Sequence, residues 1–304
     1  MVVENAQHVR ETLRAGLVVG ADGRHSTIAR LTGVEEYLKF PMTRSAFWHY
    51  RTRPSTWDED PLFRGVQGHI DYQGSGIRAA FQCDGGTMVM VALVPTAAAA
   101  GWNNHHEPSM LAYLRQNAVM TALLDASEAL TKVRALVRAD FFYRRPVGPG
   151  FALVGDAGTF KDFATGQGIS SAFISARMLH QAILVGTDAA YERYWRERDV
   201  ESLPLFFDAL RLGEADVNDA FLQLLFENLE RSPELTARLA AVSNRTLSPL
   251  EVFSTRELLR MVVPALLRGR FDVLPPFLRT GRRIAGFKQE VARRAELLAR
   301  LDPA

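Results

Sequence analysis

The feature that most constrains this chain is a short apolar run that ends in a glycine and an aspartate. Residues 151–154 predict a buried strand, Gly155 and Asp156 end it, and residues 166–168 begin an amphipathic helix ten residues later. An ionised carboxylate beside a buried strand is costly unless it accepts hydrogen bonds. The first turn of a helix offers free N–H groups and the positive end of a dipole. The pattern therefore predicts a ligand site at the carboxyl edge of a parallel sheet.

A shorter version of the same pattern stands near the start of the sequence. Residues 17–19 predict a strand buried on both faces of a parallel sheet, and Gly20 and Asp22 follow it. Ser26 is typical of a helix N-cap, and Gly33 of the residue just after a helix. Taken alone, each aspartate is equally well interpreted as a cap. Both motifs in this order, roughly 130 residues apart, favour one shared ligand site.

The residues between and after the two motifs predict other kinds of secondary structure. Residues 44–95 hold β-branched and aromatic strands separated by the turn sequences QGSG and DGG, which predicts an antiparallel sheet. Residues 108–130 predict a helix. After the second motif the apolar spacing is helical, and Pro264, Pro275 and Pro276 are expected to divide the tail into short helices. The prediction is an α/β protein with an inserted antiparallel sheet and a helical C-terminal region.

Two amphipathic stretches carry expectations about burial. The helix that starts at Gly168 has apolar residues at helical spacing, and we expect this face to be buried on the sheet; it consists of Ile169, Ala172, Phe173, Ala176 and Ile183. Five arginines near the C-terminus are interspersed with acidic residues and are interpreted as a solvated helix face; they are Arg279, Arg282, Arg283, Arg293 and Arg294.

Composition and charge exclude several classes of function. The 304 residues carry 36 basic and 34 acidic side chains, a net charge of +2, so no charge-driven nucleic-acid partner is expected. Cys83 is the single cysteine, which excludes an internal disulfide and favours the reducing cytoplasm. No apolar run is long enough for an integral membrane segment, and the polar start does not read as a signal peptide. The adjacent His105, His106 and Glu107 lack further ligands, so no metal is expected.

The two motifs resemble those of a known flavoprotein family. VVGADGRHSTIAR is similar to the DG motif, and ALVGDAGTFKDFATGQGISSAF to the GD motif, of the FAD-dependent aromatic monooxygenases, the p-hydroxybenzoate hydroxylase-like flavoproteins. The resemblance covers about residues 17–205. It implies an incomplete FAD-binding Rossmann-like domain in two parts, 1–40 and 136–186, with a substrate-binding antiparallel sheet subdomain at 41–135 and a helical C-terminal region at 187–304.

This resemblance implies roles for individual residues. Asp156 would hydrogen-bond the ribityl chain or the pyrophosphate side of FAD, and Asp22 would serve both FAD and the nicotinamide nucleotide that reduces it. No side chain is assigned to a catalytic step. Trp48, Tyr50 and Phe81 are weak candidates for the substrate pocket, since core packing is the simpler role for each. The expected cofactor-binding residues are Gly20, Asp22, Gly23, Arg24, Gly155, Asp156, Gly166, Gln167 and Gly168, of which the last three would line the flavin ring.

The sequence departs from the family pattern in two places. The G-x-G-x-x-G fingerprint for the ADP half of FAD is absent, and the nearest candidate, residues 74–76, lies in a hairpin-like context. We therefore expect a chain corresponding to about two thirds of a family member, with an exposed sheet edge that a partner chain would complete. Phe163 also follows Asp162 where this branch usually carries proline, so the phenylalanine would stack on the flavin ring or take its place.

The expected function is that of an FAD-dependent monooxygenase-type oxidoreductase, in which NAD(P)H reduces the flavin and O2 supplies one oxygen atom to a small organic substrate. An FAD-dependent reductase of isoprenoid-like substrates stays open. A tryptophan-type halogenase is disfavoured because the sequence W-x-W-x-I-P is absent. The alternative from another class is an N-terminally truncated, non-catalytic flavoprotein fragment or pseudoenzyme.

Overall fold

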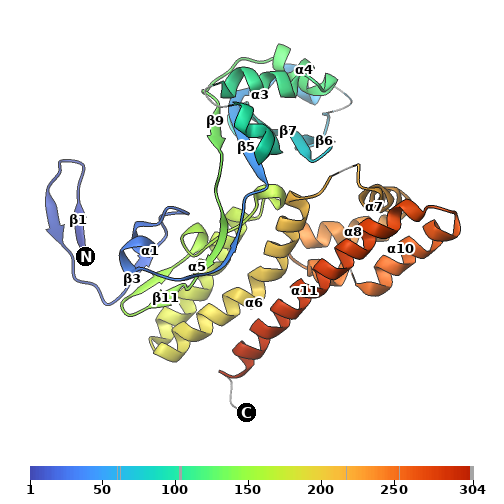
Figure 1. Cartoon of the computed structure of the whole chain (residues 1–304). Helices are drawn as coiled ribbons and strands as arrows, with labels where there is room; N and C mark the ends of the chain where they lie inside the picture. The colour runs from blue at the N-terminus through green and yellow to red at the C-terminus, as the bar shows by residue number, and fades with distance from the viewer. Residues whose placement is uncertain (60, 62, 103–104, 217, 253, 302–304) are drawn as a thin grey trace.

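The computed structural model describes residues 1–301, apart from residues 60, 62, 103, 104, 217 and 253. Within this part the chain forms an α/β molecule with an antiparallel sheet subdomain and a helical C-terminal region, which confirms the predicted fold class. Figure 1 shows the sheet subdomain at the top, the parallel strands and α5 (Gly168–Val185) below it, and the C-terminal helices on the right. A hairpin of β1 (Val2–Glu4) and β2 (Arg10–Thr12) projects on the opposite side.

The two glycine–aspartate motifs share a small sheet in the order β11-β12-β3. β12 (Phe151–Leu153) pairs in parallel with β3 (Val18–Gly20) and antiparallel with β11 (Val147–Gly148). β3 is the edge strand, and Val19 is 43% exposed. The prediction of a strand buried on both faces is therefore wrong, because the described residues leave the face that carries Val19 partly uncovered; in addition, none of the described strands pairs with the outer side of β3.

Helix α1 (Thr27–Thr32) follows β3, and both predicted boundary residues are confirmed. The Ser26 hydroxyl accepts a hydrogen bond from the backbone N–H of Ala29 at 3.0 Å. Gly33 has a φ of 63°, a left-handed conformation that glycine adopts at little cost, and closes the helix. The local sequence thus sets where the chain turns after the first motif.

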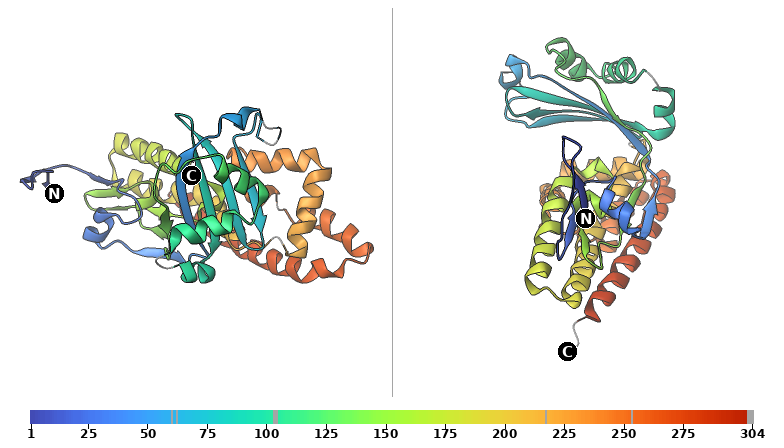
Figure 2. Two further views of the ribbon diagram at one scale, coloured as in Figure 1. Left: turned by 90° about the horizontal axis from the view of Figure 1, so that it is seen from above. Right: turned by 90° about the vertical axis from the view of Figure 1, so that its left-hand side faces the viewer.

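The antiparallel sheet predicted for residues 44–95 is confirmed, with its strands in the order β6-β7-β8-β5-β9. Alternate residues point to opposite faces. Phe47, Met88 and Met90 pack on a cover of helices, whereas Trp48 and Val91 lie on the other face. Figure 2 shows these helices on the side of the sheet that faces away from the rest of the molecule. The elements are β5 (Arg44–Thr52), β6 (Gly68–Gln73), β7 (Gly76–Cys83), β8 (Thr87–Pro95), β9 (Arg134–Leu136), α2 (Thr96–Ala99), α3 (His106–Leu114) and α4 (Ala118–Asp125).

The single helix predicted for residues 108–130 is wrong in its extent. The chain instead forms the two helices α3 and α4 and leaves the helical conformation after residue 125. Asn117 causes the break, because its side chain accepts a hydrogen bond from the N–H of Met120 at 3.0 Å and starts a new helix. The hydrophobic periodicity alone does not predict a helix cap that lies within an apolar pattern.

A third sheet connects the antiparallel subdomain to the rest of the molecule. It has the order β13-β10-β4, from β4 (Glu36–Phe40), β10 (Phe141–Arg144) and β13 (Thr159–Phe160). Its buried side chains include Phe141 and Tyr143, which belong to one cluster with Phe206. This cluster joins the sheet to the long helix α6 (Asp188–Gly213).

The C-terminal half is helical, as predicted, but the prolines divide it less than expected. Pro264 lies inside α10, and the prolines 275 and 276 lie in the first turn of α11, where a missing N–H is tolerated. α11 runs along α6, and the rings of Phe207 and Phe287 stack 4.2 Å apart. None of the described helices is both long and apolar enough to cross a bilayer. The helices are α5 (Gly168–Val185), α6 (Asp188–Gly213), α7 (Ala220–Arg231), α8 (Pro233–Ser243), α9 (Pro249–Val252), α10 (Thr255–Leu267) and α11 (Leu274–Ala299).

A buried ionic cluster fastens α6 to α11. Asp199 is 0% exposed and accepts hydrogen bonds from the Tyr37 hydroxyl at 2.7 Å and from Arg198 at 2.8 Å. Arg294 reaches the same carboxylate at 3.5 Å and pairs with Glu290. The interpretation of Arg294 as part of a solvated face is therefore wrong, because its guanidinium is one of the donors that satisfy a buried carboxylate.

The face of α5 expected to be buried is exposed. Ile169 is 76% exposed and Phe173 is 74% exposed, while Leu179, on another face of the helix, is buried. The reason is geometric: α5 packs on the sheet through its smaller side chains, and no other described element covers its opposite face. The exposed members of the predicted face are Ile169, Phe173, Ala176 and Ile183, whereas Ala172 is partly buried against Gly155.

Candidate functional site

The structure brings the two motifs to one edge. Leu153 stands opposite Gly20 in the parallel pair, so the chain leaves both strands at the same place. The carboxylate of Asp156 lies close enough to Arg24 of the first motif for the guanidinium to lower its pKa. The expected shared edge therefore exists in the fold.

Asp22 uses its carboxylate within the protein. Its Oδ2 accepts hydrogen bonds from the backbone N–H groups of Thr27, at 2.7 Å, and Ile28, at 3.4 Å. Burial tends to raise the pKa of Asp22, but the hydrogen bonds from Ser26 and Thr27 outweigh it and lower the pKa below the ordinary value. Asp22 is thus a second cap of α1, beside Ser26.

Asp156 is in a different situation. It lies in the 3₁₀ turn η3 (Gly155–Ala157), is half-buried, and its carboxylate accepts no hydrogen bond from any described residue. Burial raises its pKa, and the charges of Lys161 and Arg24 act against that rise. A carboxylate with this exposure and no internal donors is free to accept hydrogen bonds from the hydroxyl groups of a ligand.

Two of the expected cofactor-binding glycines, Gly20 and Gly155, have a packing role. A Cβ on Gly20 would stand 2.6 Å from Leu153 Cδ2 and 3.0 Å from Ile28 Cβ. A Cβ on Gly155 would stand 3.1 Å from that of Ala172, and the N–H of Gly155 donates to the Ser175 hydroxyl at 2.9 Å. These glycines let the strand ends approach the helices behind them.

The remaining glycines leave open space at the edge. A Cβ on Gly23, Gly166 or Gly168 would meet no atom within 4 Å. Gly166 has a φ of 65° and ends the turn η4 (Phe163–Thr165), and Gly168 begins α5. The first N–H groups of α5 have no acceptor inside the helix. This opening can receive a flat or anionic group that approaches the backbone closely.

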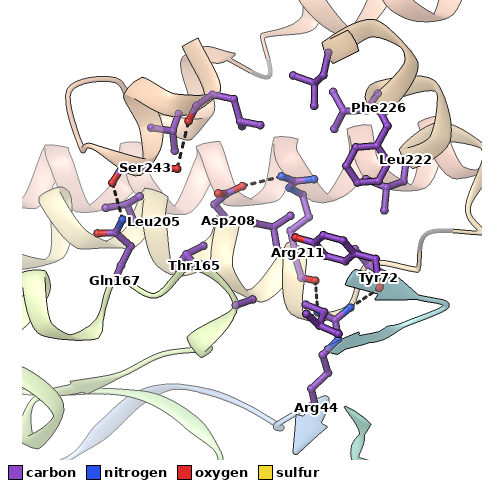
Figure 3. A pocket seen from close by; sticks show the side chains of 18 residues that line it. Arg44, Tyr72, Thr165, Gln167, Leu205, Asp208, Arg211, Leu222, Phe226 and Ser243 are labelled. Atoms are coloured by element: carbon purple, nitrogen blue, oxygen red, sulfur yellow. Dashed lines mark hydrogen bonds and ion pairs between the residues drawn. The ribbon is translucent and has the colours of Figure 1, made fainter. Parts of the chain in front are cut away.

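Gln167 differs from its two glycine neighbours because its side chain is buried and turns toward α8. Its Nε2 donates to the carbonyl of Ser243 at 2.7 Å (Figure 3). Its Oε1 is buried and has no partner among the described residues. Only the backbone of Gln167 therefore remains at the edge that carries Asp156.

The uncovered face of the antiparallel sheet forms a cavity beside this edge. The cavity measures about 620 Å³ and is closed on one side by the loop 163–166. Of the three weak candidates for a substrate pocket, Trp48 and Phe81 line this cavity rather than a closed core, whereas Tyr50 does not line it. The lining is almost wholly apolar, which is typical of a site for an organic molecule.

Four further residues near the edge were missed by sequence reasoning. Lys161 donates to the hydroxyl of Ser171 in the first turn of α5, and Arg245 donates to the same oxygen at 3.2 Å and pairs with Glu201. Burial, together with the charge of Arg245, lowers the pKa of Lys161 to about 8. Lys161 stands within the quoted GD motif, but no sequence signal points to Arg245 or Glu201, which lie in the helical half.

Comparison with known proteins identifies the fold. No protein-family model and no curated protein sequence matches the chain. The flavoprotein/dehydrogenase from Cytophaga hutchinsonii has a TM-score of 0.64 at 14% identity, over 85% of this chain and 61% of that one. The myxobacterial FAD-dependent chondrochloren halogenase CndH has a TM-score of 0.57 at 18% identity, over 96% and 65%. PqsL, described as a probable FAD-dependent monooxygenase from Pseudomonas aeruginosa, has a TM-score of 0.51 at 19% identity, over 71% and 61%.

These similarities concern the fold. The chain has the fold that FAD-dependent halogenases and monooxygenases share, and it spans less than two thirds of the length of each of the three structures. The fold implied by the DG and GD motifs therefore agrees with the fold of these solved structures.

Proposed function

We propose that this chain is the flavin- and substrate-binding part of an FAD-dependent oxidoreductase. The observation that carries the proposal is the half-buried carboxylate of Asp156, which lacks a donor of its own. It lies at the same edge as the open start of α5, beside an apolar cavity of about 620 Å³. In this proposal, residues 1–40 and 136–186 bind the cofactor and residues 41–135 bind the substrate. Residues 187–304 form the helical region that supports both parts.

The residues of this edge fit the flavin half of FAD. Asp156 would accept hydrogen bonds from ribityl hydroxyl groups, and the backbone from Gly166 to Gly168 would lie along the ring, where the free N–H groups of α5 favour negative charge. Gly23 leaves room for the pyrophosphate side, and the neighbouring Arg24 would place a positive charge there. When bound, the flavin supplies the redox chemistry. For the ADP half, no residue of this chain is assigned.

The protein side of the mechanism consists of positioning and exclusion of water. Phe163 lines the apolar cavity and packs against the sheet face. An organic substrate in the cavity would replace water over the sheet face and lie beside the loop 163–166. Lys161, held by Ser171, places a cation behind this loop and adds to the positive potential at the start of α5.

The finer assignment is a monooxygenase that uses NAD(P)H and O2 on a small organic substrate in the cytoplasm. The apolar cavity supports an organic substrate. The motif resemblance supports NAD(P)H as reductant and O2 as co-substrate. The single cysteine, Cys83, is free, which suits a reducing compartment.

A non-catalytic flavoprotein fragment or pseudoenzyme is the second candidate, and one observation favours it. The outer side of β3 is unpaired among the described strands, and the exposed face of α5 beside it carries Ile169 and Phe173. An unpaired parallel strand next to an apolar helix face is a surface that another polypeptide can cover. We propose that a partner chain pairs with β3 and completes the sheet there.

Titration with FAD and with riboflavin tests the proposal, because Asp156 and the backbone of residues 166–168 would contact the ribityl chain and the ring, which both compounds contain. We expect the chain to bind both, and Asp156→Asn to weaken both about tenfold, since it replaces a charged acceptor. The matched control is Asp84→Asn, an exposed aspartate in the β7–β8 turn, which leaves binding unchanged. A folded wild-type chain that binds neither compound contradicts the proposal. Bound FAD that NADH and NADPH both fail to reduce supports the non-catalytic alternative.

A further inference from the structure

Helix α10 is apolar on two faces, and the described residues cover only one of them. On the outer face, Leu259 is 45% exposed, Val263 is 46% exposed and Leu267 is 84% exposed. These residues are four positions apart, so they form one stripe along the helix. The inner residues pack in a buried cluster with α7 and α11; they are Leu258, Met261, Val262 and Ala265. Because a helix that is apolar all round is ordinarily buried, the outer stripe points to a partner.

Further exposed apolar side chains follow the end of α10. Phe271 begins the 3₁₀ turn η5 (Phe271–Val273) and is 68% exposed, and Leu274 and Leu278 in the first turns of α11 are 37% and 47% exposed. Figure 1 shows α10 and the turn into α11 at the end of the molecule opposite the N-terminal hairpin. We call this surface the α10–α11 tip; its apolar members are Leu259, Val263, Leu267, Phe271, Leu274 and Leu278.

The segment that forms the α10–α11 tip is strongly basic. Residues 254–283 contain seven arginines and two acidic residues, whereas the whole chain has a net charge of only +2. Three of these arginines pair with acidic side chains of residues 214–227. Arg256, Arg268 and Arg282 are exposed, and none of them forms an ion pair with a described residue. Each lies within one helical turn, along the sequence, of an apolar member of the tip, so cations border the apolar surface.

An anionic bilayer surface matches this combination. Leucine and phenylalanine side chains enter the boundary between lipid headgroups and acyl chains, and arginines near the surface are attracted by the negative potential of anionic lipids. A protein partner would need acidic groups placed opposite three separated arginines, whereas an anionic leaflet presents negative charge across its whole surface. The charges around the tip therefore favour a membrane over a protein.

We propose that the α10–α11 tip docks on the surface of an anionic membrane, with Leu267 and Phe271 entering the headgroup boundary and Arg256, Arg268 and Arg282 facing anionic lipids. The tip lies in the interface and does not cross the bilayer, in agreement with the finding that no described helix is suited to span one. This docking uses none of the residues assigned to the flavin, so it stands independently of the proposed function.

Flotation with lipid vesicles tests the contribution of charge. The probes are vesicles of phosphatidylcholine alone and of phosphatidylcholine with about 30 mol % phosphatidylglycerol. We expect the chain to bind the anionic vesicles at least about tenfold more tightly than the neutral ones, with an affinity that falls as salt is added. Arg256→Gln combined with Arg268→Gln should weaken binding to anionic vesicles about 25-fold, since each arginine near the surface contributes about fivefold. The matched control is Arg30→Gln with Arg177→Gln, two exposed arginines outside the tip, which should leave binding unchanged.

A second pair of variants tests the apolar contribution and the location. Leu267→Ser with Phe271→Ser should weaken binding to anionic vesicles about tenfold or more, because two side chains no longer enter the interface. The matched control is Leu184→Ser with Phe173→Ser, the same residue types at 68% and 74% exposure on α5, which should bind as the wild type does. Thermal unfolding of each variant verifies that it folds.

Three results would overturn the proposal. The first is a folded chain that binds neither kind of vesicle or binds both equally. The second is tip variants that bind as well as their controls. The third is a chain that ignores vesicles but forms an oligomer, seen by analytical ultracentrifugation, that Leu267→Ser with Phe271→Ser dissociates, since the tip would then be a protein interface.

Discussion

Two corners of this molecule, the chain from β3 to α1 and the chain from β12 to α5, carry the same strand–glycine–aspartate pattern and use it differently. After β3, the carboxylate of Asp22 accepts the N–H of Thr27 at 2.7 Å and caps α1. After β12, the carboxylate of Asp156 accepts no hydrogen bond from the described residues and stands among cations. The first carboxylate stabilises the fold, and the second is available to a ligand.

The spacing between aspartate and helix explains the difference. Thr27 lies five residues after Asp22, so the carboxylate reaches the first N–H groups of α1. Gly168 lies twelve residues after Asp156, and the intervening chain forms β13 and η4. The start of α5 is therefore left without a protein carboxylate, and the corner keeps both an acceptor and a set of donors for a ligand. A motif of this kind becomes a site only when its own helix does not consume the carboxylate.

The largest effect on the free energy of unfolding is expected from α5, the helix that follows the second corner. Leu179 is 3% exposed and packs with Ala152 and Tyr194, so Leu179→Ala should lower the free energy of unfolding by about 2–5 kcal/mol. Phe173→Ala, on the exposed face of α5, should change it by less than about 0.5 kcal/mol. Urea unfolding of both variants measures the difference. Comparable losses would mean that the exposed face is covered in solution, as in an assembly with another chain.

A smaller effect on the free energy of unfolding is expected from Lys161, the buried cation beside Asp156. Because the pKa of Lys161 is lowered to about 8 in the fold, the unfolded chain binds more protons between about pH 8 and pH 10.5, and stability should rise over this interval. The gain is on the order of 3 kcal/mol. Lys161→Met should remove this rise, whereas Lys132→Met, at an exposed position, should retain it. Unfolding free energies measured across the interval would contradict the assignment if wild type and Lys161→Met ran in parallel.

Most of the fold could be predicted from the sequence, because its signals are local. Ser26 and Gly33 bound α1 as expected, and the alternating residues of β5, β7 and β8 indicated the antiparallel sheet. The face of α5 could not be predicted, since helical spacing shows that Ile169 and Phe173 share a side and not whether anything covers it. The role of Gln167 was missed for a similar reason. Its partner Ser243 lies 76 residues away in a region without a motif.

The smallest effect on the free energy of unfolding is expected from Asp22 and Asp156 themselves. The sign of this effect differs between the two residues. The pKa of Asp22 is lowered in the fold, so its contribution is present above the unfolded pKa and is lost as pH falls through the folded value. The pKa of Asp156 is raised, so wild type should lose stability relative to Asp156→Asn as pH rises from the unfolded pKa through the folded one.

At neutral pH, Asp22→Asn should therefore cost about 0.5 kcal/mol, the size of one charge at a helix start, whereas Asp156→Asn should cost nothing or stabilise the chain. Unfolding free energies of the three proteins between about pH 3 and pH 7 measure both slopes. Slopes of the same sign would show that Asp156 finds donors within the folded chain. Its carboxylate would then be a cap like that of Asp22, and the flavin assignment would lose the observation that carries it.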